Sequence, residues 1–289
     1  MVTCIGHASN NLHWYMLTLN SIVQFMESLE NFFRPLLEEA GRRAMSHFLC
    51  TTHEIKRDGS PVTAADKAVQ EYLLAAIMRK FPQDGVIAEE EEMLQSPRQG
   101  SRYWTIDPID GTIPFMAGMA SWGIAVGLIE ENAPVAGFIY LPATGDLFYS
   151  TGTHVWRNSQ PRLLTTDRSL HTNTILLTHA RPHQRYTLRD SFPGRVLSLG
   201  TASAHLSLVA TGGAHVVLIG HDKVWDLAPG YAMLSANGGV LHYLDGTECD
   251  LSALLDGRSA PLPMLGGPAS LVEETLSHLD YWAIPSFAV

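Results

Sequence analysis

The feature that most constrains this chain is a short apolar run that ends abruptly in two carboxylates. Residues 103–106 are typical of a buried strand, and Asp107 and Asp110 follow it with Pro108 between them. Pro108 fixes one backbone angle, and Gly111 permits a sharp turn or the close approach of a ligand. Carboxylates this close repel each other unless they share a cation, which favours a hard metal such as Mg²⁺. An ordinary turn is the alternative, because Asp-Pro and Asp-Gly are common in loops.

Length and composition indicate an ordinary globular protein. The chain has 289 residues, of which 46% are hydrophobic and 17% charged, so it can form one large domain or two lobes. The formal net charge of -10 argues against nucleic acid or an anionic membrane as a partner, since both need a basic surface. The three cysteines are scattered, which favours a reducing cytoplasm over a disulfide framework or a zinc finger. No apolar run approaches the roughly 20 residues that a membrane helix needs.

The chain divides into three regions by pattern. Residues 1–25 lack Lys and Arg, so they carry no positively charged signal region, and we expect a poorly packed extension. Residues 26–160 predict a helix pair, at 27–49 and about 63–81, packed against an antiparallel sheet. Residues 161–289 alternate strands with helices, which predicts an α/β lobe.

The expected elements follow the spacing of apolar residues and the turn formers between them. In the first lobe, the strands are expected at 85–88, 103–106, 123–129, 135–141, 147–149 and 154–156. In the second lobe, the strands are expected at 174–177, 195–199, 214–219 and 239–243, and the helices at 184–190, 202–210 and 226–236.

Further acids lie where they can join Asp107. Glu89 and Glu90 begin an acidic run directly after the strand at 85–88, just as Asp107 follows its own strand. We therefore expect Glu89 and Asp107 to meet at one edge of a sheet. A run of acids in a solvated loop is the alternative.

Two more acids stand at the beginnings of predicted helices. Asp66 falls three residues after Thr63, a suitable N-cap, and Asp226 stands where the helix at 226–236 begins. An acid in the first turn favours the helix dipole, and N-capping by itself accounts for Asp226. Neither position therefore indicates chemistry when it is taken alone.

Taken together, these motifs resemble the inositol monophosphatase family, within the Mg²⁺-dependent, lithium-sensitive phosphatases. The resemblance runs from about residue 56 to residue 244, and its three acidic motifs in this order are specific, although each alone is weak. The matching segments are 63–66, 89–90, 104–115, 200–202, 210–214 and 225–228. The family implies a mixed α+β and α/β fold, a layered αβαβα sandwich of the sugar-phosphatase type.

The resemblance also implies two or three Mg²⁺ ions per site and assigns their ligands. Glu89, Asp107 and the main-chain carbonyl of Ile109 resemble the ligands of the first metal. Asp107, Asp110 and Asp226 resemble those of the second, so Asp107 would bridge the two ions.

The catalytic roles come from the same resemblance. Asp66 and Thr112 resemble the pair that orients and deprotonates the attacking water, and Glu90 matches an acid that helps to hold water at the metals. The backbone N–H groups of Gly111 and Thr112 are expected to hold phosphate oxygens. The expected substrate contacts are Gly200, Thr201, Ala202 and Asp222.

Departures from the family leave the substrate open. Inositol-cleaving members carry a glutamate seven residues before the last metal aspartate, and here that position is Ile219. The family's Gly-Thr-Thr-Asn-Phe is Gly-Thr-Ile-Pro-Phe in this chain, and the pattern from Phe115 to Gly123 is closer to relatives that hydrolyse histidinol phosphate. Asp222 or Lys223 could make the contacts of the missing acid.

The sequence thus predicts a cytoplasmic, Mg²⁺-dependent phosphomonoesterase that acts on a small alcohol phosphate similar to inositol monophosphate. It acts through metal-activated water, and the family implies a homodimer. A histidinol-phosphate phosphatase is one alternative, and a bisphosphate nucleotidase or sugar bisphosphatase is another. The bisphosphate enzymes need extra basic residues, for which Lys223 and Arg181 are the candidates. A non-catalytic regulatory binding protein is disfavoured, because a decayed site should have lost some of its acids.

Overall fold

Helices cover the faces of two main sheets in the computed structural model, which describes residues 6–49, 53–56, 61–90, 93–98, 100–152, 154–179 and 186–281. The helices are α1 (Gly6–Met45), α2 (Ala64–Lys80), α3 (Thr112–Met116), α4 (Ala202–Ala210), α5 (Val224–Ala236) and α6 (Ala269–Leu276). A short 3-10 helix, η3, spans Leu251–Leu254. None of the described helices combines the length and the apolar character that crossing a membrane requires.

The strands form one large and one smaller sheet, with two small pairs beside them. The large sheet has the order β10-β9-β8-β7-β6-β5-β3-β4, and the smaller sheet has the order β13-β11-β14-β16-β15. The strands of the large sheet are β3 (Gly85–Ala88), β4 (Met93–Gln95), β5 (Arg102–Asp110), β6 (Gly123–Glu130), β7 (Ala133–Leu141), β8 (Asp146–Thr151), β9 (His154–Arg157) and β10 (Gln160–Arg162). Those of the smaller sheet are β11 (Ile175–Thr178), β13 (Arg195–Leu197), β14 (Val216–Ile219), β15 (Val240–Tyr243) and β16 (Met264–Gly267). The pairs are β1 (His53–Ile55) with β2 (Pro61–Thr63), and β12 (Tyr186–Leu188) with β17 (Leu279–Tyr281).

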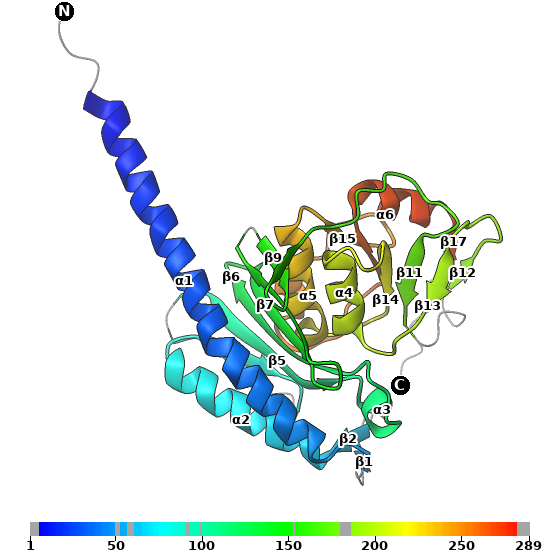
Figure 1. Ribbon diagram of the computed structural model, residues 1–289, viewed down its shortest axis with the longest axis horizontal. Coiled ribbons are helices and arrows are strands. Elements are labelled where there is room, and N and C mark those ends of the chain that lie inside the picture. The colour runs from blue at the N-terminus through cyan, green and yellow to red at the C-terminus, as the bar shows by residue number, and fades with distance from the viewer. Residues whose placement is uncertain are drawn as a thin grey trace, which may run out of the picture.

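The layers alternate between helices and sheets. Helices α1 and α2 pack on one face of the large sheet, α4 and α5 lie between the two sheets, and α6 covers the far face of the smaller sheet (Figure 1). This arrangement confirms the predicted αβαβα sandwich.

Helix α1 is longer than the sequence predicts, since it begins at Gly6 instead of residue 27. Its buried face carries Leu29, Phe33 and Leu37, spaced by one helical turn. In Figure 1 its first turns extend beyond the other layers. The packing of residues 1–25 stays a prediction, because the side chains before residue 24 lie outside those that the structure describes.

The core under α1 and α2 anchors β5, the strand that ends in the acids. Trp104 on β5 is fully buried, and its ring lies 5.0 Å from that of Phe33, which also stacks on Phe138 at 4.6 Å. The indole N–H of Trp104 donates to Asp84 Oδ2 at 2.9 Å. Each such side chain stabilises the fold by about 1.5–3 kcal/mol through burial, so β5 is held firmly.

The first sheet was predicted to be antiparallel, and its described pairings are antiparallel except one, because β3 runs parallel to β5. All four residues of β3 are buried, as in strands that are covered on both faces. The register pairs Ala88 with Ile106, and Glu89 N–H donates to Ile106 O at 3.1 Å. Glu89 therefore lies next to Asp107 where β3 ends, but β5 does not end at residue 106 as predicted, because it continues to Asp110.

The predicted helix at 184–190 was also wrong, since residues 186–188 form β12 (residues 184 and 185 lie outside the described part). Tyr186 is buried and Thr187 is exposed, an alternation with the strand period. Strand β12 pairs with β17, and the Tyr186 hydroxyl bonds Thr178 Oγ1 at 2.6 Å. Strand β17 is distant from β12 in sequence, so local spacing did not reveal the pairing.

Candidate active site

Three acids, two from β5 and one from α5, meet near the end of β5. Ligand oxygens of Asp107, Asp110 and Asp226 all lie within 4.8 Å of one another. Asp107 and Asp110 are buried at 1% and 8% exposure, and Asp226 is half-buried. The structure thus brings together the three predicted ligands of the second metal.

The chain turns sharply as it leaves β5. The pairing of β5 with β6 is irregular between Asp107 and Asp110, and Ile109 N–H donates to Asp107 Oδ1 at 3.0 Å. Gly111 has a φ of 89°, and a Cβ atom there would collide with the Thr201 side chain. Glycine therefore lets the 200–202 segment pack against the acids.

Asp110 is oriented by the first turn of α4. Ser203 N–H donates to Asp110 Oδ2 at 2.6 Å, which ties the end of the large sheet to the layer between the sheets. Burial raises the pKa of Asp110 to about 6, even though the bonds from residues 202 and 203 favour its charged form.

Asp226 reaches the cluster from the first turn of α5. The helix has Lys223 as its N-cap, so the alternative that Asp226 is the N-cap was wrong. Asp226 Oδ2 accepts from Lys223 N–H at 2.8 Å, the bond that the third residue of a capping box makes.

Lys56 holds the two acids that follow β3. Its Nζ lies 2.8 Å from Glu89 Oε1 and 2.8 Å from Glu90 Oε1. Gln70 fixes the backbone of Glu90 by accepting from its N–H at 2.8 Å and donating to its carbonyl at 2.9 Å. Burial raises the pKa of Glu90 to about 7, and although burial opposes the charge of Lys56, the two carboxylates raise the pKa of that lysine. The sequence did not signal either Lys56 or Gln70.

Asp66 presents one bound and one unsatisfied oxygen. Thr63 is the N-cap of α2, as predicted, and Asp66 Oδ2 accepts from its N–H at 2.8 Å and its hydroxyl at 2.5 Å. Asp66 Oδ1 is buried and has no hydrogen-bond partner among the described residues. Burial raises the pKa of Asp66 to about 6. No described hydrogen bond joins it to Thr112, whose hydroxyl donates to Ile109 O at 3.4 Å.

The electrostatics of the cluster favour a cation. Burial, reinforced by the neighbouring carboxylates, raises the pKa of Asp107 and of Asp226 well above the ordinary range. The donors are all oxygen, the set that Mg²⁺ prefers, and the unsatisfied Asp66 Oδ1 offers a further acceptor. The residues present therefore fit divalent cations.

A cavity of about 120 Å³ opens beside these acids. All four expected substrate contacts line it, together with Asp110. The rest of its wall consists of His179, His205, Leu218 and Ile219. No local motif in the sequence marks the two histidines that line the cavity. Lys223 Nζ instead lies 4.9 Å from the centre of the Trp225 ring.

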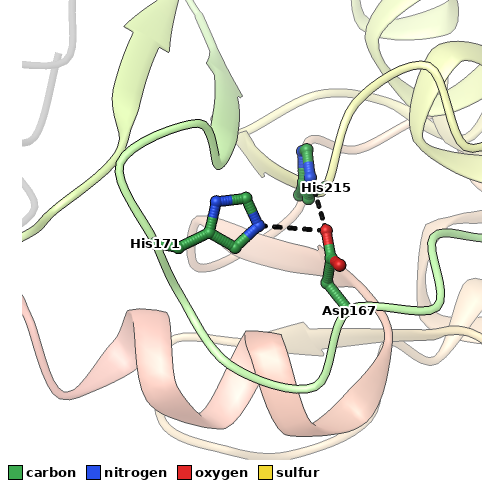
Figure 2. Close-up of side chains that lie close together, drawn as sticks. All are labelled: Asp167, His171 and His215. Atoms are coloured by element: carbon green, nitrogen blue, oxygen red, sulfur yellow. Dashed lines mark hydrogen bonds and ion pairs between the residues drawn. The ribbon is translucent and has the colours of Figure 1, made fainter.

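A second cluster is formed by Asp167, His171 and His215 (Figure 2), none of which lines this cavity. Both imidazoles place Nε2 3.0 Å from Asp167 Oδ2. Their Nδ1 atoms accept backbone N–H groups of Asn173 and Ile175, at 3.2 and 3.1 Å. Each neutral ring therefore carries its proton on Nε2, directed at the carboxylate, which leaves no lone pair there for a metal. The cluster fits a hydrogen-bonded clamp between the connector before β11 and the beginning of β14.

The comparison with known families decides the identity of the fold. The model of the inositol monophosphatase family matches residues 26–265. The chain belongs to this family.

Relatives within the inositol monophosphatase family carry more than one activity in their names. A histidinol-phosphatase from Chlorobaculum parvum is 31% identical over 236 residues, covering 77% of this chain and 87% of the relative. A 3'(2'),5'-bisphosphate nucleotidase CysQ from Salmonella typhimurium is 31% identical over 209 residues, covering 68% of this chain and 81% of the relative. The solved structure of an IMPase from Thermotoga maritima has a TM-score of 0.74 at 22% identity, covering 86% of this chain and 96% of that one. Membership of this family supports phosphatase activity, but the relatives differ in the substrate that their names give, so the substrate of this chain stays open.

Proposed function

We propose that this protein is a Mg²⁺-dependent phosphomonoesterase that hydrolyses a small alcohol phosphate. The observation that carries the proposal is the convergence of Asp107, Asp110 and Asp226 within 4.8 Å, inside the fold of a phosphatase family. Buried carboxylates this close need a shared positive charge, and phosphoryl transfer needs positioning and charge neutralisation more than a protein nucleophile.

Two or three Mg²⁺ ions would be held by the acids and one carbonyl. Glu89, Asp107 and the carbonyl of Ile109 are the proposed ligands of one ion, and Asp107, Asp110 and Asp226 those of another. When bound, Mg²⁺ lowers the pKa of water and neutralises charge on the phosphate.

The other residues position water and phosphate. Asp66 is the proposed proton acceptor, because Thr63 holds its Oδ2 and leaves Oδ1 without a described partner. Thr112 and Glu90 are proposed to orient the attacking water. The amides of Gly111 and Thr112 are proposed to bind phosphate oxygens, and residues 200–202 with Asp222 to contact the leaving group that the cavity receives.

Release of inorganic phosphate from a panel of small phosphate monoesters tests the proposal. Turnover should require Mg²⁺, stop with EDTA and be inhibited by lithium, as the family resemblance implies. Turnover that survives EDTA would exclude the mechanism, and no turnover of any ester would favour the regulatory binding protein.

A histidinol-phosphate phosphatase is a second candidate, supported by the 31% identity to the Chlorobaculum relative. Direct comparison of histidinol phosphate with inositol 1-phosphate separates the two. A bisphosphate nucleotidase is the third candidate, and Arg181, one of the basic residues proposed to bind its second phosphate, lies outside the described part of the chain.

The predicted homodimer and the predicted cytoplasmic location also belong to the proposal. Sedimentation tests the oligomeric state, and cell fractionation tests the location.

A further inference from the structure

Gln70 directs its side-chain amide at the backbone of a single residue next to the acids. Its Oε1 accepts from Glu90 N–H at 2.8 Å, and its Nε2 donates to Glu90 O at 2.9 Å. Because the N–H can only donate and the carbonyl can only accept, the amide fits in one orientation. Gln70 and Glu90 are 7% and 4% exposed, so water competes little for these bonds. The two bonds therefore hold the Glu90 backbone in place.

Glu90 lies just beyond the strand pairing that holds its neighbour Glu89. The register of β3 with β5 ends at Ala88 and Ile106, and Glu89 N–H adds a bond to Ile106 O at 3.1 Å. One residue further on, a buried N–H and a buried carbonyl would be costly if they were left unpaired. Gln70 satisfies both, as a neighbouring strand would. Glu89 is therefore fixed on both sides, by β5 before it and by Gln70 after it.

Gln70 also connects these residues to the helix that carries Asp66. The two residues lie four positions apart on α2, about one helical turn, and both side chains are buried. Thr63 N–H holds Asp66 Oδ2 at the beginning of the same helix. A continuous path of backbone and hydrogen bonds therefore runs from the proposed proton acceptor through Gln70 to Glu89.

Lys56 holds the same two acids in a different way. Its ammonium group contacts the carboxylates of Glu89 and Glu90, so it repels a cation that approaches either of them. Both Gln70 bonds are made to backbone atoms, so they can persist when a cation takes a carboxylate. The Gln70 bonds can therefore prepare Glu89 for a metal ion, whereas the Lys56 ion pair competes with one.

We propose that Gln70 is a positioning residue, which fixes Glu89 for Mg²⁺ and thereby sets the affinity of the site for that ion. The inference rests on the proposed Mg²⁺-dependent function and adds a residue to it that acts through the backbone and is not itself a ligand. Residues that orient a metal ligand typically change metal affinity about 10–100-fold when they are replaced.

Calorimetric titration with Mg²⁺ alone, without substrate, tests the inference. Gln70→Met has nearly the same shape but lacks both bonds, so its dissociation constant for Mg²⁺ should rise about 10–100-fold. Gln70→Asn keeps the amide on a side chain that is one methylene shorter, and it should rise by at least about tenfold. This second variant decides the matter if Gln70→Met does not fold.

A double-mutant cycle shows whether the effect passes through Glu89. Glu89→Gln removes the charge of the proposed ligand, so adding Gln70→Met to it should change the dissociation constant by less than about threefold. A full 10–100-fold further loss in that background would overturn the inference.

Asn237→Leu is the matched control. Asn237 Nδ2 donates to the carbonyls of Arg162 and Ala210 at 3.0 and 2.8 Å, so this variant also loses two bonds from a side-chain amide to the backbone. Asn237 caps the C-terminal end of α5, the opposite end from Asp226. Urea unfolding in EDTA should show lower stability in Gln70→Met and in Asn237→Leu, but only Gln70→Met should bind Mg²⁺ more weakly.

The outcomes separate this inference from the proposed function. Mg²⁺ binding by Gln70→Met within about twofold of wild type, or equal weakening in Asn237→Leu, would refute the positioning role while the wild-type enzyme still binds Mg²⁺ and releases phosphate. A wild-type protein that neither binds Mg²⁺ nor hydrolyses any ester of the panel would refute the proposed function, and this inference with it.

Discussion

Two clusters of potential metal ligands in this molecule differ in whether their polar atoms are already satisfied. In the acid cluster, a buried Asp107 lies close to a half-buried Asp226, and the pKa of each is raised by loss of solvent and by repulsion from neighbouring carboxylates. In the clamp, Asp167 accepts hydrogen bonds from two imidazoles that backbone N–H groups orient. The pKa of Asp167 is lowered, first by its bond from His171. A short distance between potential ligand atoms therefore does not identify a metal site by itself. Negative charge that is buried without a positive partner, as in the acid cluster, favours one.

The largest expected difference between the clusters is in activity. Asp107→Asn should reduce kcat by at least about 10³-fold, because it removes the charge of the proposed bridging ligand while keeping its shape. Asp167→Asn should leave kcat within about twofold. Steady-state kinetics with saturating Mg²⁺ measures both. Similar losses in the two variants would contradict the distinction.

Mg²⁺ should stabilise the protein through the acid cluster only. At 100 times its dissociation constant, a ligand of the folded state adds about 2.7 kcal/mol, which raises Tm by roughly 4 °C in a chain of 289 residues. Differential scanning fluorimetry with and without Mg²⁺ measures the shift. It should disappear in Asp107→Asn and persist in His171→Leu, and a shift that requires His171 would reverse our assignment of the clamp.

Lys56 should stabilise the metal-free protein by balancing two carboxylates. Lys56→Met leaves Glu89 and Glu90 without their ion-pair partner, which we expect to cost about 1–3 kcal/mol of unfolding free energy in EDTA. Lys67→Met is the matched control, because the Lys67–Glu54 pair is more exposed, and it should cost under about 0.5 kcal/mol. Urea unfolding measures both. Mg²⁺ should reduce the loss in Lys56→Met, and an equal loss in both variants would show that Lys56 plays no special part.

The carboxylates of the active site and the clamp should also change the unfolding free energy with pH in opposite directions, by smaller amounts than the effects above. Asp66 and Asp110 each have a pKa of about 6 in the folded state against an ordinary 3.8, so folding is favoured below pH 4 and this contribution is lost as pH rises through 6. The lowered pKa of Asp167 acts in reverse, because its contribution is present above its ordinary pKa and is lost on acidification. Unfolding free energies in EDTA between pH 2 and 7 measure both slopes, because the Asp167 contribution is lost below its ordinary pKa of 3.8. Asp110→Asn should flatten the decline toward neutral pH, and an unchanged slope would contradict the assignment.

Sequence reasoning predicted the parts of the fold that depend on local pattern. The apolar runs at β3 and β5 and the capping box at Thr63 were all visible, because hydrophobic spacing and capping act over a few residues. The helix expected at 184–190 failed because β12 depends on pairing with β17, near the other end of the described chain. The parallel pairing of β3 with β5 and the N-cap of α5 were likewise decided by packing.

Some features of the candidate site could likewise be predicted from the sequence, and others depend on tertiary packing. Asp107 and Asp110 are close because only two residues separate them in the chain, and the family resemblance named the other acids. The approach of Asp226 and the bond from Ser203 to Asp110 depend on α4 and α5 packing between the sheets. Lys56 and Gln70 contact Glu90 only through tertiary structure, so no local signal could have identified them.

By itself, the sequence determined the family, the layered sandwich and the list of acids, because motif order and apolar spacing are properties of the chain alone. The tertiary structure decided which of those acids share buried space and which hydrogen-bonding groups line the cavity beside them. It also separated the acid cluster from the clamp at Asp167. The physical reason is that burial and backbone hydrogen bonds set the charge and the tautomer of a side chain, and both depend on neighbours that are distant in sequence.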